Sequence, residues 1–98
     1  MSYYLSMKYF EWNEEKNIWL KAERDLGFED VIVAIQQDKL LETTENLNKD
    51  KYQNQQMYIV EINSYAYLVP FVEDEEKIFL KTIIPSRKAT KKYLIDKS

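Results

Sequence analysis

The stretch MYIVEINSYAYLVPFV, residues 57–72, decides the fold of this chain of 98 residues. β-Branched and aromatic side chains, which favour strands, fill both MYIVEI (57–62) and YAYLVPFV (65–72), and only Asn-Ser separates the two runs. A two-residue connection between two such runs predicts an antiparallel hairpin. Because Pro70 has no amide hydrogen, we expect the sheet to be free or bulged on one side of that residue.

The sequence after the hairpin extends it into a meander and then a helix. A charged turn, EDEE (73–76), precedes KIFLKTIIP (77–85), which predicts a third strand that ends at Pro85. Ser86 is a good N-cap residue, so a final helix is expected from Arg87 to about Ile95.

The sequence before the hairpin alternates strands and helices. Ile18, Trp19 and Ala22 recur at helical spacing, Leu26 extends this apolar stripe, and the stripe is expected to face the core. Gly27, the only glycine, is a plausible break between two helices. The expected elements are a strand over 7–12, helices over 14–25 and 28–37, a strand over 40–43 and a polar loop over 46–56.

Together these elements predict a single α+β domain over residues 1–98, in the order β-α-α-β-β-β-β-α. We expect a small antiparallel sheet, built as a β-meander, with the helices packed on one face. Residues 1–6 are expected to be a disordered extension, or to precede an alternative start at Met7.

The composition excludes several kinds of site. Without cysteine or histidine the chain has no disulfide framework, no cysteine zinc site and no histidine acid–base. One glycine cannot form a glycine-rich phosphate loop, and no metal or cofactor signature is present. No apolar run approaches the roughly 20 residues that span a bilayer and no signal peptide is visible, so a cytoplasmic protein without a membrane partner is expected.

The charge is divided unevenly along the chain, whose net charge is −3. Residues 1–76 carry a net charge of −9, whereas residues 77–98 carry a net charge of +6. Such asymmetry suggests an anionic partner for the basic end. A solvated terminal helix with lysines near its negative dipole end is the other interpretation, and the charge pattern alone leaves both open.

Three segments carry a resemblance to a known family. YFEWNEEKN opens the domain, GFEDV follows the first expected helix, and TIIPSRKATKKY closes the domain. This pattern resembles the BrnT-like toxins of type II toxin–antitoxin operons, over roughly residues 8–93. The matched positions are Phe10, Glu11, Trp12, Lys16 and Asn17 in the opening motif, Phe28 and Glu29 in the middle one, and Arg87, Ala89 and Thr90 in the closing one.

The resemblance implies a fold like that of other toxin ribonucleases, metal-independent cleavage of RNA, and neutralisation by a ribbon–helix–helix antitoxin. It also allows a homodimer or a hetero-oligomer with the antitoxin. The chain departs from the family at three places: Arg24 stands where a histidine is usual, and Gln56 and Thr82 stand where arginines are usual. Two interpretations follow: a subgroup that uses Arg24 and Lys81 instead, or a catalytically eroded protein that only docks an antitoxin or another protein.

The candidate catalytic residues follow from the needs of RNA cleavage through the 2′-hydroxyl, which are a base and cations for the developing charge. Arg87 is the strongest candidate, because a guanidinium holds a phosphate bidentately. Lys81, expected in mid-strand, either lines a groove or lies at an edge. Arg24 and Glu11 complete the candidate set. Expected RNA contacts outside that set are Lys88, Lys91 and Lys92.

Overall fold

The computed structural model describes residues 8–45 and 55–96 and confirms the α+β class and the expected order of elements. The expected extension over residues 1–6 and the polar loop up to residue 54 lie outside the described residues. In chain order the elements are β1 (Tyr9–Trp12), α1 (Glu14–Arg24), α2 (Phe28–Gln36), β2 (Leu40–Glu45), β3 (Gln55–Ile62), β4 (Tyr65–Glu73), β5 (Lys77–Leu80), β6 (Ile84–Pro85), α3 (Arg87–Thr90) and the π-helical segment η2 (Lys91–Ile95).

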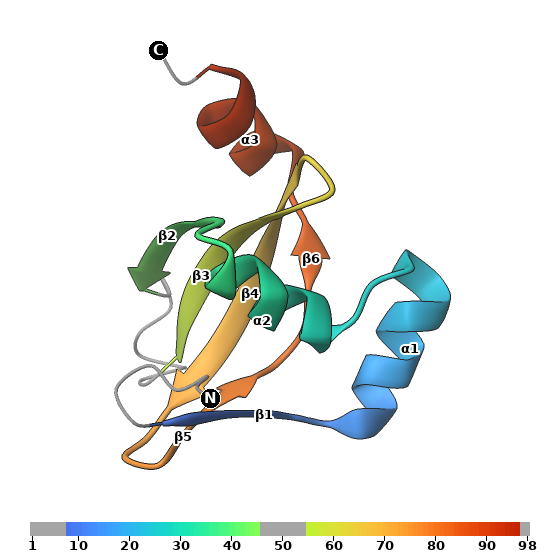
Figure 1. The fold of residues 1–98 in the computed structure, drawn as a ribbon, viewed down its shortest axis with the longest axis vertical. Coiled ribbons are helices and arrows are strands. Elements are labelled where there is room, and N and C mark those ends of the chain that lie inside the picture. The colour runs from blue at the N-terminus through green and yellow to red at the C-terminus, as the bar shows by residue number, and fades with distance from the viewer. Residues whose placement is uncertain (1–7, 46–54, 97–98) are drawn as a thin grey trace.

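The hairpin of β3 and β4 is the centre of the sheet, as the sequence predicts (Figure 1). Its register runs without a break from Ile62 opposite Tyr65 to Gln55 opposite Val72. The two turn residues, Asn63 and Ser64, have φ values of 55° and 66°. Positive φ at both central residues gives the tight turn whose twist matches that of paired strands.

One edge of the sheet differs from the expected antiparallel arrangement. The strand order is β1-β5-β4-β3-β2, and β1 lies parallel to β5, from Tyr9 opposite Lys77 to Trp12 opposite Leu80. The last strands of the meander do pair antiparallel, as expected. The sheet is therefore mixed. Two helices and three strands separate β1 from β5, and this long connection allows β5 to run parallel to β1.

The expected continuous strand over 77–85 is wrong, because it is interrupted at residues 81–83. β5 pairs with β4 from Phe71 onwards, and β6 pairs with the part of β4 that precedes Val69. The break between β5 and β6 therefore lies opposite Pro70. The amide of Lys81 donates to the carbonyl of Pro70 over 2.8 Å. Proline cannot donate in return, and the interruption is the expected irregularity beside it.

The apolar face predicted for α1 is also wrong. Ile18 and Trp19 are 60% and 44% exposed, whereas the buried residues of α1 are Asn17 and Leu20. The helix is rotated because its contact with the start of α2 is polar: the side chain of Asn17 accepts a hydrogen bond from the amide of Phe28 over 2.8 Å. This contact requires Asn17 to face inwards.

Helices pack on both faces of the sheet, not on one as expected (Figure 1). The larger core lies between the sheet and the first two helices, where Phe28, Val31, Val60 and Phe71 are at most 1% exposed. A smaller cluster lies on the opposite face, where Ile59 and Ala66 pack against Ala89. A helix can pack on this second face because the alternate residues of β3 and β4 that point to it are apolar as well.

Candidate functional site

The last helix is fixed to β4 by a small hydrogen-bond network. The hydroxyl of Thr90 accepts from the amide of Ala66 over 2.8 Å and donates to the carbonyl of Ser86 over 2.8 Å. The hydroxyl of Ser86 accepts from the amide of Ala89 over 3.0 Å. Ala89 and Thr90, both in the closing motif, are each 7% exposed, so these motif positions hold the helix in place.

We expect Thr90→Val to lower the free energy of unfolding by about 1–3 kcal/mol, because valine keeps the volume but leaves the buried amide of Ala66 without an acceptor. Urea denaturation followed by circular dichroism measures the change. Thr43→Val, at an exposed position of β2, is the matched control and should change stability by less than about 0.5 kcal/mol. Equal effects in the two variants would contradict this role of Thr90.

Four exposed cations lie on the helix that this network anchors, and we call them the basic turn: Arg87, Lys88, Lys91 and Lys92. No ion pair joins any of them to a side chain in residues 8–45 or 55–96. The ammonium of Lys92 lies 5.1 Å from the ring centroid of Tyr93. The guanidinium of Arg87 is thus available to an external anion, whereas the amide of Ala89 is already used by Ser86.

A groove of about 440 Å³ lies between the basic turn and the second face of the sheet. Apolar side chains of β3, β4 and α3 form its floor, and Lys88 and Lys92 line it from the helix. The complete lining is Thr44, Glu45, Met57, Ile59, Leu68, Ser86, Lys88, Ala89, Lys92 and Tyr93. Sequence reasoning predicted the lysines but missed the floor, although the alternation along β3 places Met57 and Ile59 on one face.

The structure does not bring the four candidate catalytic residues together. None of Arg87, Lys81, Arg24 and Glu11 lines the groove, and within the described residues no hydrogen bond or ion pair links any two of them. Arg24 lies at the end of α1, with its guanidinium 5.5 Å from the ring centroid of Trp19. Lys91 is also absent from the groove lining.

Glu11 and Lys81 have their own local contacts. The carboxylate of Glu11 lies 3.2 Å from the ammonium of Lys77, and it raises the pKa of Lys77 through a hydrogen bond and its charge. Lys81 is exposed beyond the end of β5, 5.8 Å from the ring centroid of Phe79. Ile83, two residues after the exposed Lys81, is fully buried.

The opening and middle motifs meet at the junction of the two helices. The side-chain amide of Asn17 donates to both carboxylate oxygens of Glu29, at 3.0 and 3.2 Å, and the rings of Trp12 and Phe28 stack with centroids 5.5 Å apart. The hydrogen bond from Asn17 is the main cause of a lowered pKa of Glu29. These motif residues therefore stabilise the fold, whereas Arg87 is the closing-motif residue left facing solvent.

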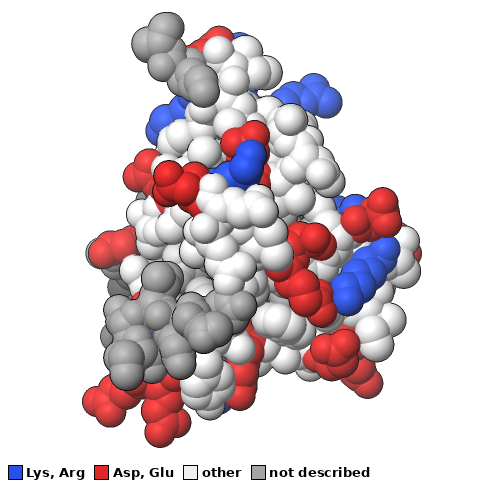
Figure 2. Space-filling view, viewed as in Figure 1, with Lys and Arg blue, Asp and Glu red and all other residues white. Residues whose placement is uncertain are grey.

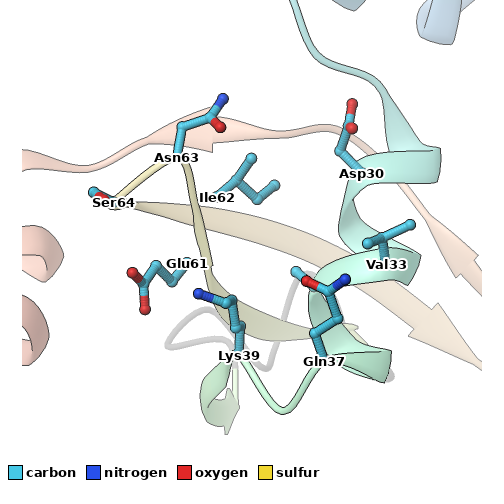
Figure 3. A pocket seen from close by; sticks show the side chains of 9 residues that line it. Asp30, Val33, Gln37, Lys39, Glu61, Ile62, Asn63 and Ser64 are labelled. Atoms are coloured by element: carbon cyan, nitrogen blue, oxygen red, sulfur yellow. The ribbon is translucent and has the colours of Figure 1, made fainter.

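A second, polar pocket of about 340 Å³ lies between α2 and the β3–β4 turn (Figure 3). Lys39 and Glu61 both line it, with Asp30 from α2 and Asn63 from the turn. Acidic side chains are prominent on the surrounding face, which is the face that carries α2 (Figure 2). The last helix, which carries the basic turn, packs on the other face of the sheet.

Comparisons with known proteins give no relative for this chain: no protein family, no curated protein and no solved structure matches it. Within residues 8–45 and 55–96 no helix is long and apolar enough to cross a membrane. The same part of the chain contains no group of three or more His, Cys, Asp or Glu side chains placed to hold a metal ion.

Proposed function

We propose that this protein binds RNA at the basic turn and cleaves it without a metal ion, as the toxin of a bacterial type II toxin–antitoxin pair. The observation that carries the proposal is a cluster of four exposed cations, unpaired within the described residues, on a helix fixed to the sheet by Thr90. Because the helix is already fixed, binding of a phosphate backbone has to order only the cationic side chains and not the helix that carries them.

The chemical role proposed for Arg87 follows from its guanidinium, which has no ion-pair partner in residues 8–45 and 55–96. Attack of a 2′-hydroxyl on the adjacent phosphate develops negative charge on the phosphate oxygens, and a bidentate guanidinium stabilises that charge. The net negative charge of residues 1–76 supports this location. It repels RNA from the rest of the protein, so the basic turn is the surface to which RNA binds most favourably. The antitoxin proposed as partner is a ribbon–helix–helix protein, in a hetero-oligomer with the toxin or with a toxin homodimer.

A second candidate function is binding without cleavage, in which the chain only docks an antitoxin or another protein. The separation of Arg24, Lys81 and Glu11 from the groove favours it. Under this function, RNA incubated with high concentrations of folded protein stays intact. Cleavage that survives EDTA and disappears in Arg87→Ala favours the first function instead.

We expect Lys88→Glu to weaken binding of a labelled RNA at least tenfold at low salt and to flatten the dependence of affinity on salt, because one phosphate contact is lost and one repulsion gained. Fluorescence anisotropy over a series of salt concentrations measures both effects. The matched control is Lys39→Glu, which makes the same charge change in the polar pocket on the other face of the sheet. An equal loss in both variants would assign the effect to net charge and contradict the basic turn as the site.

A further inference from the structure

We propose that the groove beside the basic turn holds an unpaired nucleobase, so that this protein binds single-stranded RNA in preference to duplex RNA. The inference rests on the proposed RNA binding and adds the kind of RNA that is bound. It comes from two features that meet in the groove: a wall with the ammonium groups of Lys88 and Lys92, and a floor of apolar side chains.

A nucleotide, like the groove, combines a charged part with an apolar part. Its phosphate carries the charge, and its base has flat, weakly hydrated faces that proteins bind by stacking and apolar contact. With the phosphate on the lysine wall, the base lies over Ile59 and Leu68 on the floor. Glu45 also lines the groove, which favours the phosphate on the lysine side, away from β2. The volume of about 440 Å³ lies within the range of small-molecule sites.

Tyr93 supplies an aromatic ring at the edge of this floor. Its hydroxyl donates to the carboxylate of Glu42 over 3.1 Å, and the ammonium of Lys92 lies near its ring. A ring that is held at both its hydroxyl and its face is ordered before a ligand arrives, so it offers a base a stacking surface at small entropic cost. Tyr58 in β3 is 5% exposed and stacks on Phe71, so it cannot serve this purpose.

Duplex RNA cannot use the groove in this way. Its bases are stacked and paired, and its major groove is too deep and narrow for side chains to enter. A duplex therefore meets only the cations of the basic turn, whereas a single strand meets both the cations and the apolar floor. An acidic amphipathic protein segment could satisfy the same two features, and its binding is an outcome of the test below.

The test compares a labelled 12-nucleotide single strand with a blunt duplex of the same length, by fluorescence anisotropy at fixed salt. For the wild type we expect the single strand to bind at least about fivefold more tightly per site. Tyr93→Leu should abolish most of this preference, and Tyr93→Phe, which keeps the ring, should preserve it. Thr44→Leu narrows the groove from β2 and should weaken only single-strand binding, whereas Thr43→Leu, on the opposite face of the same strand, should change neither.

The possible results separate this inference from the proposed function. Equal affinity for both RNAs, or equal effects of Tyr93→Leu and Tyr93→Phe, overturns the unpaired-base site while RNA binding stands. Binding of neither RNA, at low salt and with verified folding, overturns both. Displacement of the single strand by an acidic amphipathic peptide, but not by excess free nucleotide, assigns the groove to a protein partner and overturns the inference.

Discussion

Asn17→Ala is expected to destabilise the protein by about 2–4 kcal/mol, which lowers the melting temperature by on the order of 10–25 °C for a domain of this size. Asn17 is fully buried, and its side chain accepts from the amide of Phe28 and donates to the carboxylate of Glu29. Alanine leaves the buried amide of Phe28 without an acceptor and removes one of the two side chains that donate to the carboxylate of Glu29. Thermal and urea unfolding of the purified variant measure the effect.

The control for Asn17→Ala is Lys21→Ala, which removes the other partner of Glu29. Lys21 and Glu29 lie 3.2 Å apart with side chains 51% and 53% exposed, so this ion pair is screened by water. We expect its loss to cost less than about 1 kcal/mol. If the two variants are equally stable, the buried hydrogen bonds of Asn17 do not hold the two helices together.

The pH dependence gives Asn17→Ala a second readout. Glu29 has a lowered pKa in the folded protein, mainly through its hydrogen bond from Asn17. A carboxylate with a lowered pKa stabilises the fold above its unfolded pKa, and this contribution is lost as the pH falls through the folded value. The difference in stability between wild type and Asn17→Ala should therefore narrow on acidification, and a difference that widens would contradict the assignment.

Arg87→Ala is expected to lower the rate of RNA cleavage by about 10²- to 10³-fold, the loss typical of removing a group that stabilises transition-state charge. Stability should change by less than about 0.5 kcal/mol, because Arg87 is exposed and has no partner among the described residues. Single-turnover cleavage of an end-labelled RNA, with EDTA present, measures the rate.

Arg87→Lys is the conservative variant for this position. A lysine keeps the charge but cannot hold a phosphate bidentately, so an intermediate rate is expected. Lys91→Ala is the matched control, since it removes one charge from the basic turn but leaves the guanidinium of Arg87 in place, so its rate should fall much less than that of Arg87→Ala. Equal rates in the wild type and Arg87→Ala would remove Arg87 from the mechanism.

Local patterns predicted most of the fold. The hairpin follows from two strand-like runs joined by two residues, and both early helices begin at the residues predicted for them, Glu14 and Phe28. The failures arise from contacts between segments far apart in the chain. The interruption at 81–83 depends on Pro70 in the neighbouring strand, and the rotation of α1 depends on hydrogen bonds that Asn17 makes with α2.

The candidate site, like the fold, was predictable from the sequence only in part. The basic turn is visible in the sequence because its four cations lie within six consecutive residues. The groove is not, because its lining combines residues of β2, β3 and β4 with the last helix, and its existence depends on which face of the sheet the helix covers. The absence of Glu11, Arg24 and Lys81 from the groove lining likewise depends on three-dimensional placement that residue types do not encode.

Arg87 is proposed to belong to a working ribonuclease site. The most direct measurement is induced expression of the chain in a bacterial host, beside Arg87→Ala at equal soluble protein, with growth and total RNA followed together. Growth arrest with loss of RNA for the wild type, and neither for Arg87→Ala, is the predicted result. Normal growth and intact RNA for both proteins would contradict the claim and favour the protein that binds without cleaving.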